Sequence, residues 1–214
     1  MSTTDTITIE GFAAWLAAFR DRVTEHRSYL TELDSAIGDA DHGANMARGM
    51  AAVMEKVGAT SATTADELFK TVGMTLVTSV GGASGPLYGT FFLRLGMTAG
   101  AVAECDAAAL SSALRAGLDG VVARGKAEAG DKTMFDAMAP ALEAMDAAIA
   151  SGASLADATA AARDAAAAGR DATEPLVARK GRASYLGERS AGHLDPGATS
   201  TALLFDALAE VTAS

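Results

Sequence analysis

The sequence of 214 residues contains a single cysteine, Cys105, so no disulfide can form within the chain. One cysteine is typical of a protein in a reducing compartment. No stretch approaches 18 apolar residues without a charge, and the N-terminus lacks the basic and apolar regions of a signal peptide. We therefore expect a cytoplasmic protein with no membrane partner.

Positive charge is also scarce. The chain has 17 Lys and Arg residues against 27 Asp and Glu residues, which gives a formal net charge of −10. Nucleic-acid backbones are bound mainly by Lys and Arg, so this balance argues against a nucleic-acid partner. A polyphosphate ligand would need metal cations between its own negative charge and that of the protein.

Aromatic residues make up only 5% of the chain, and runs of strand-forming residues are few, whereas alanine is abundant. Alanine is the best helix former, so we expect an all-α protein, folded as a single domain over residues 1–214 with residues 1–8 flexible. Apolar residues recur at helical spacing in eight segments, which predict helices over residues 9–37, 43–56, 65–79, 86–101, 106–124, 134–150, 155–169 and 198–212. A long loop is predicted over residues 179–197.

Three carboxylates lie within eight positions of one another: Asp34, Asp39 and Asp41. On one ideal helix the first two would lie about 140° apart and the last two about 200° apart, so a helix cannot bring them together. They converge only if the chain turns, and we expect Gly38 and Gly43 to permit that turn by adopting positive φ. The sequence therefore predicts a helix, a tight loop and a second helix.

Converging carboxylates repel one another unless a cation lies among them. Their oxygens are hard ligands, which favour Mg²⁺ or Ca²⁺ over Zn²⁺, and the spacing is not that of an EF-hand. The N-terminus of the following helix favours an anion, so a metal-bound nucleotide polyphosphate is the predicted ligand. The alternative is an acidic turn that is merely solvated.

Glycine-rich stretches occur at three further helix junctions, at residues 81–86, 125–131 and 187–197. In a bundle with short connections, successive helices are antiparallel, so every second junction falls at the same end. The spacing suggests that these stretches gather with the acidic loop around one site. The stretch 81–86 can present backbone N–H groups and a hydroxyl to phosphate, although it is neither a Walker A loop nor a Rossmann fingerprint.

Four stretches together resemble the L subunits of dihydroxyacetone kinases, which bind the nucleotide. They are residues 33–46, 79–90, 124–134 and 178–200, in the order of that family. The resemblance runs from about residue 10 to the C-terminus. It implies an up-and-down barrel of eight antiparallel helices with the nucleotide at one end.

The resemblance also implies the site. Two Mg²⁺ ions would be held by Asp34, Asp39 and Asp41. ADP or ATP would contact the positions that match the family's nucleotide-binding residues, namely His42, Gly43, Ala44, Asn45, Ala83, Ser84, Gly125, Met134, Arg182, Asp195, Pro196 and Gly197. Arg182 would stabilise the phosphates, and no residue is expected to act as a general acid or base.

The family's acceptor, dihydroxyacetone, lies on a separate K subunit. A free-standing L subunit of this length is similar to the phosphoenolpyruvate-dependent type, whose bound ADP is rephosphorylated in place by a phosphohistidine on an M subunit of the sugar phosphotransferase system. Two alternatives stay open. One is a subunit of an ATP-dependent kinase for another small ketose or triose. The other is an ADP-sensing module that controls a transcription regulator.

Overall fold

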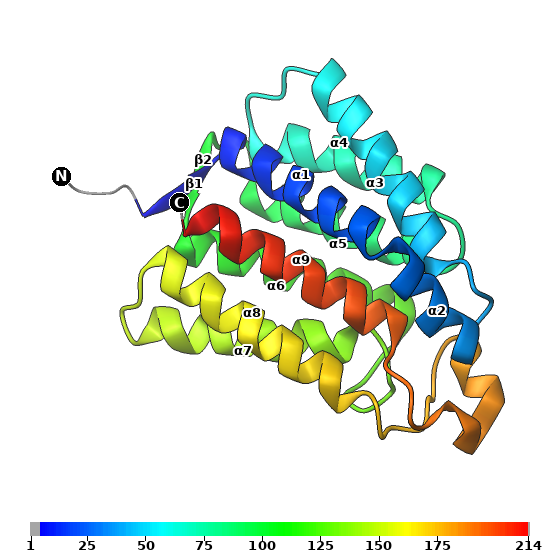
Figure 1. The fold of residues 1–214 in the computed structure, drawn as a ribbon. Coiled ribbons are helices and arrows are strands. Elements are labelled where there is room, and N and C mark those ends of the chain that lie inside the picture. The colour runs from blue at the N-terminus through cyan, green and yellow to red at the C-terminus, as the bar shows by residue number, and fades with distance from the viewer. Residues whose placement is uncertain (1–4, 214) are drawn as a thin grey trace.

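The computed structural model describes residues 5–213, which are mostly helical (Figure 1). The α-helices are α1 (Ile9–Glu25), α2 (Arg27–Ile37), α3 (His42–Ala59), α4 (Ala65–Ser79), α5 (Ser84–Ala99), α6 (Ala107–Gly125), α7 (Phe135–Ala150), α8 (Leu155–Ala172) and α9 (Pro196–Thr212). The other regular elements are the 3-10 segment η1 (Arg182–Ser190) and the strands β1 (Thr6–Thr8) and β2 (Glu104–Asp106). The predicted all-α class is confirmed.

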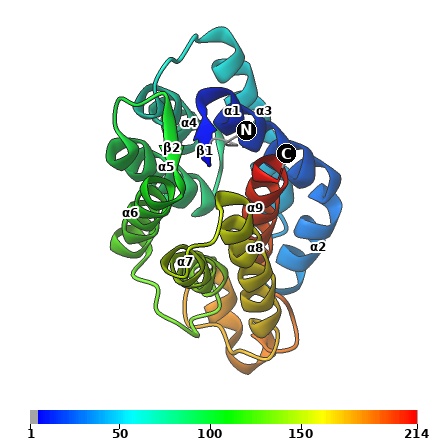
Figure 2. The same ribbon diagram turned by 90° about the vertical axis from the view of Figure 1, so that its left-hand side faces the viewer.

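Eight of the described helices form a closed ring, seen from one end in Figure 2. The order around the ring is α1, α3, α4, α5, α6, α7, α8, α9 and back to α1. Consecutive helices of the ring run in opposite directions, which confirms the predicted up-and-down arrangement. Helix α2 lies outside the ring, where it contacts α3, α9 and η1.

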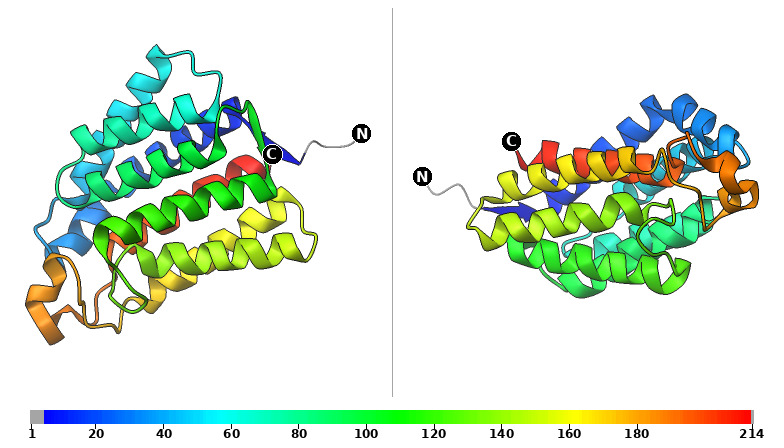
Figure 3. Two further views of the ribbon diagram at one scale, coloured as in Figure 1. Left: turned by 180° about the vertical axis from the view of Figure 1, so that it is seen from behind. Right: turned by 90° about the horizontal axis from the view of Figure 1, so that it is seen from below.

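Four connections meet at one end of the ring, on the right in Figure 1. They are residues 38–41, 80–83, 126–134 and 173–195, which follow α2, α4, α6 and α8. The two short strands lie at the opposite end, and both views of Figure 3 show η1 beside α2 at the end where the four connections meet. Helices α3, α5, α7 and α9 therefore all begin at this end.

The interior of the ring holds most of the chain's few aromatic side chains. Phe12 packs edge-on against Phe69, with 4.9 Å between ring centroids, and Trp15 lies 5.8 Å from Phe92. The Trp15 indole N–H donates to the carbonyl oxygen of Leu204 at 2.9 Å. This bond joins α1 to α9 and so fastens the pair of helices that closes the ring.

The first predicted helix is two helices in the structure. The chain leaves helical geometry at His26, where φ is −90° and ψ is 12°. The backbone N–H of His26 still donates to the carbonyl oxygen of Arg22 at 2.9 Å, and the imidazole Nδ1 lies at the same distance from that oxygen. The break lets α2 depart from the ring and carry Asp34 to the end of the molecule.

The expectation that residues 1–8 are flexible differs from the structure at residues 6–8, which form β1. The strand pairs antiparallel with β2 and places Ile7, which is buried, opposite Cys105. Residues 1–4 lie outside the described residues. The predicted long loop over residues 179–197 contains η1. Among the helices that the structure describes, none is both long and apolar enough to cross a membrane.

Candidate metal and nucleotide site

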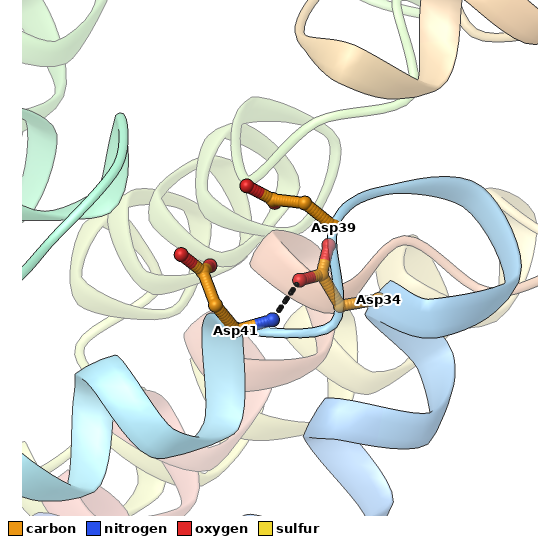
Figure 4. Close-up of side chains that lie close together, drawn as sticks. All are labelled: Asp34, Asp39 and Asp41. Atoms are coloured by element: carbon orange, nitrogen blue, oxygen red, sulfur yellow. Dashed lines mark hydrogen bonds between the residues drawn. The ribbon is translucent and has the colours of Figure 1, made fainter.

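The loop between α2 and α3 brings the three carboxylates together (Figure 4). One oxygen from each of Asp34, Asp39 and Asp41 lies within 4.8 Å of the other two. Asp34 is buried, and its Oδ2 accepts hydrogen bonds from the backbone N–H groups of Asp41, at 2.7 Å, and of His42, at 3.1 Å. The buried carboxylate therefore holds the start of α3 in place while the other two reach toward solvent.

The glycines of this loop act differently from what we predicted. Gly38 has φ −140°, and Gly43 lies inside α3, so the left-handed residue of the turn is Ala40, with φ 61°. A Cβ on Gly38 would overlap Oδ1 of Asp34, and one on Gly43 would overlap the carbonyl oxygen of Arg27. Both positions need glycine because there is no space for a side chain.

A cavity of about 470 Å³ opens beside the carboxylates, and all four connections at this end contribute to its wall. Twelve of the fifteen predicted site residues line it: Asp34, Asp39, Asp41, His42, Ala83, Ser84, Gly125, Met134, Arg182, Asp195, Pro196 and Gly197. This volume falls in the range of small-ligand pockets.

The other three predicted residues, Gly43, Ala44 and Asn45, lie in the first turn of α3 but are not among the described residues of the cavity wall. Gly43 packs against α2. The side-chain oxygen of Asn45 accepts a hydrogen bond from Arg48 Nη2 at 2.6 Å, and a Cβ on Gly81 would lie 2.9 Å from Asn45 Nδ2. Asn45 therefore supports the glycine-rich connection before α5.

An ion pair crosses the mouth of the cavity. The Nε of Arg182, from η1, lies 3.0 Å from Oδ2 of Asp39. The arginine side chain is 66% exposed, and surface ion pairs of this kind contribute about 0–1 kcal/mol to the stability of the fold. A cation or a phosphate can therefore compete for either partner at small cost.

Both ring nitrogens of His42 are engaged. Nδ1 lies 3.0 Å from the hydroxyl of Ser84, and Nε2 lies 2.9 Å from the hydroxyl of Ser200. The Ser200 hydroxyl also donates to the carbonyl oxygen of Gly197 at 3.1 Å and lies 2.8 Å from the Tyr88 hydroxyl. Burial lowers the pKa of His42, against the opposing charges of two nearby carboxylates, so the ring is neutral near pH 7.

These contacts favour one tautomer. With the Ser200 proton on the Gly197 carbonyl oxygen, Ser200 accepts from Nε2–H of His42, and Nδ1 accepts the hydroxyl proton of Ser84. The lone pairs of the Ser84 hydroxyl are left for a cation or a donor. A histidine held in this way is a positioning group and not a free nucleophile.

Several residues of this site had no role predicted from the sequence. Tyr88 and Lys132 line the cavity wall and are buried, and Arg124 and Lys180 also contribute to the wall. Ser200 lies behind His42. All five fall inside the four stretches that carry the family resemblance. The stretches therefore contained the signal, but the individual roles depend on contacts that the sequence does not display.

Asp195 is the N-cap residue of α9 and lies on the cavity wall. Its Oδ2 accepts the backbone N–H of Ala198 at 2.6 Å. Burial raises the pKa of Asp195 to about 7, because the charged form loses its solvation. The Ala198 N–H and the charge of Lys132 oppose the rise, while Asp136 adds to it. The carboxyl group therefore titrates near neutral pH in the folded protein.

This shift predicts a pH dependence of stability. Because the folded pKa lies above the unfolded value, the native state binds more protons between about pH 4 and 7, and the free energy of unfolding falls as pH rises through that window. Asp195→Asn keeps the cap but removes the titration. From pH 5 to pH 8, the wild type should lose on the order of 2 kcal/mol relative to the variant, measured by urea unfolding without ligands. Equal pH dependence in the two proteins would contradict this assignment.

Several known proteins are similar in sequence to this chain. The sequence pattern described as the DAK2 domain matches residues 36–210. The PTS-dependent dihydroxyacetone kinase, ADP-binding subunit DhaL of Lactococcus lactis is 44% identical over 207 residues, which span 97% of this chain and 100% of that relative. The PEP-dependent dihydroxyacetone kinase, ADP-binding subunit DhaL of Escherichia coli is 47% identical over 195 residues, or 91% of this chain and 93% of the relative.

A solved structure is similar as well. It is the dihydroxyacetone kinase of C. freundii in complex with AMP-PNP and Mg²⁺, with a TM-score of 0.71 and 29% sequence identity. The match covers 92% of this chain and 33% of the kinase, so this chain spans about a third of that protein's length.

Proposed function

Since this chain belongs to the DAK2 domain family, we propose that it is the ADP-binding subunit of a phosphoenolpyruvate-dependent dihydroxyacetone kinase. The similarity to the Lactococcus and Escherichia subunits extends over nearly the whole of each chain. The observation that carries the proposal is the convergence of three carboxylates at the mouth of the 470 Å³ cavity.

The carboxylates fit two Mg²⁺ ions. Three hard oxygen ligands lie within 4.8 Å of one another, and Asp34 reaches the group although it is buried. When bound, the ions would offset the charge of a nucleotide polyphosphate. Asp34, Asp39 and Asp41 would hold them, while the amide bonds to Asp34 keep the loop in shape.

The cavity wall fits a nucleotide. The N-termini of α3, α5, α7 and α9 gather at this end, so the N–H groups of their first turns and their helix dipoles favour phosphate. His42, Ala83 and Ser84 would lie along the phosphates, assisted by Gly43, Ala44 and Asn45 behind them. The remaining contacts would come from Gly125, from Met134 against the adenine, and from Asp195, Pro196 and Gly197.

Phosphoryl transfer needs positioning and charge neutralisation more than covalent participation by the protein. The neutral His42, bonded at both nitrogens, has no acid or base role in this scheme. Arg182 would leave Asp39 and stabilise the charge of the transferred phosphoryl group. This chain would supply the nucleotide, and a partner K subunit would hold the dihydroxyacetone.

We propose two further partners. An M subunit of the phosphotransferase system would rephosphorylate the bound ADP, and a transcription regulator is a further candidate partner. The chain would act in the cytoplasm as one domain. Helix α1 lies outside the matched residues 36–210, yet it closes the ring against α9, which supports a domain that includes it.

A reconstitution tests the proposal. The protein is combined with K and M subunits, phosphoenolpyruvate, the general phosphotransferase proteins and dihydroxyacetone, and dihydroxyacetone phosphate is measured. The proposal predicts turnover without added ATP. Turnover that requires free ATP and ignores the M subunit would favour the ATP-dependent alternative. No transfer under either condition, with regulator binding that depends on ADP, would favour the sensing module.

A further inference from the structure

Lys132 is a buried cation in the connection between α6 and α7. Its side chain is 1% exposed, and its ammonium group donates to three backbone carbonyl oxygens, those of Ser190 at 2.6 Å, Leu176 at 3.0 Å and Glu174 at 3.3 Å. An ammonium has three donors, so these three acceptors satisfy it. The residue lines the cavity, yet the proposed chemistry gives it no role.

The three carbonyls belong to one segment, residues 174–190, which we call the η1 lobe. Glu174 and Leu176 lie where the chain enters the lobe, and Ser190 lies where it leaves. The ammonium therefore joins the two chain segments that enter and leave the lobe at its base. A further bond, from the backbone N–H of Arg179 to the carbonyl of Asp131 at 3.1 Å, links the lobe to the same connection.

The described residues also hold the lobe through apolar packing. A small apolar cluster of Ile37, Ala178 and Ala183, with Leu186 packed against it, joins the lobe to the end of α2 and is separate from the main core. Burial lowers the pKa of Lys132, and the charges of Asp195 and Glu174 act in the opposite direction. A cation at this position is thus supported by carbonyl dipoles and by nearby carboxylates.

The lobe carries Arg182, which lies 3.0 Å from Asp39 across the cavity mouth. From this geometry we propose that Lys132 is a positioning residue that fastens the η1 lobe over the site and so sets Arg182 against the carboxylates and the phosphates. The inference deepens the proposed function, on which its activity readout depends. Its structural readouts stand without that function.

The test compares Lys132→Met with Lys126→Met. Both lysines lie in the same connection and both have left-handed φ, 63° and 54°, but Lys126 is exposed and does not line the cavity. In Lys132→Met, hydrogen exchange over residues 176–190 should accelerate about tenfold or more, and kcat should fall about tenfold. The dissociation constant of ADP should change by only about threefold, and Lys126→Met should resemble the wild type.

A double-mutant cycle tests whether Lys132 affects kcat through Arg182. In an Arg182→Ala background, Lys132→Met should lower kcat by about twofold or less, because the group that it positions is already gone. Unchanged exchange of the lobe, or a tenfold loss of kcat in both backgrounds, would overturn the proposal. If wild type neither binds ADP nor transfers phosphate, the proposed function fails, while the exchange result still judges the role of Lys132 in fastening the lobe.

A measurement on the wild type covers the case in which Lys132→Met does not fold. The sequence has five lysines, and the other four are exposed or half-buried. In a protein labelled with ¹⁵N at lysine, we expect one ammonium signal whose protons exchange slowly with water, because all three are hydrogen-bonded. Rapid exchange of all five ammonium groups would overturn the proposal.

Discussion

Asp39→Asn should weaken Mg²⁺-dependent ADP binding by about 10²-fold to 10³-fold. The substitution keeps the shape of the side chain but removes one of three converging charges. Losing one member of a closely spaced charge group in a binding site costs about 2–5 kcal/mol, and each 1.4 kcal/mol is a factor of ten in affinity. Isothermal titration calorimetry with ADP, at several Mg²⁺ concentrations, measures the change.

Asp119→Asn is the matched control. Asp119 is an exposed acid on α6, so its replacement removes the same charge from the protein without touching the loop. It should leave ADP affinity within about twofold of wild type. The ion pair of Asp39 with Arg182 is exposed enough that Asp39→Asn should change the free energy of unfolding by about 0.5 kcal/mol or less. Equal ADP affinity in Asp39→Asn and Asp119→Asn would contradict the metal assignment.

Gly38→Ala should lower Mg²⁺-dependent ADP affinity by about 10²-fold. A Cβ at this position would overlap Oδ1 of Asp34, so the buried carboxylate must turn away or the loop must shift. Either movement breaks the amide bonds that Asp34 makes to the start of α3. Overpacking of this kind also costs stability, about 1–3 kcal/mol. Calorimetry and urea unfolding report the two effects separately.

Ala40→Gly is the control for that variant, since it lies in the same loop and makes the opposite change. Ala40 has φ 61°, a conformation that costs a residue with a Cβ about 1–2 kcal/mol relative to glycine. The variant should keep its ADP affinity within about threefold, and its stability should be equal to or slightly above that of the wild type. If Gly38→Ala bound Mg²⁺ and ADP as tightly as Ala40→Gly, the carboxylate of Asp34 would not be needed for the site.

The helices and their antiparallel order were predictable because their causes are local, whereas the closed barrel was implied by the family resemblance. Alanine content favours helix in each segment, and the apolar spacing shows which face of the helix is buried. Short connections make neighbouring helices antiparallel, which places every second junction at the same end. The antiparallel order followed without knowledge of any distant contact. The convergence of the four connections on one cavity is a consequence of that order.

The predictions that failed depend on contacts between distant segments or on space. We expected Gly38 and Gly43 to adopt positive φ. Glycine is needed at these two positions because the carboxylate of Asp34 and the backbone of α2 leave no space for a side chain. Strand β1 forms because it meets β2, about 98 positions away, as the contact of Thr6 with Glu104 shows. A local pattern contains neither the partner segment nor the shape of the neighbouring surface.

The same limit explains the residues that had no assigned role. The carbonyl partners of Lys132 lie 42, 44 and 58 positions further along the chain. Tyr88 and His42 meet at Ser200, which is 112 positions from one and 158 from the other. Their residue types suggested chemistry, but only the packed helices show which groups they position.

Native mass spectrometry of the purified protein, with no nucleotide added, tests the central assignment most directly. We predict a mass increase that corresponds to ADP with two Mg²⁺ ions, retained through gel filtration and lost in Asp39→Asn. A bare chain that binds no nucleotide at any Mg²⁺ concentration would contradict the assignment of the carboxylates and of the cavity beside them.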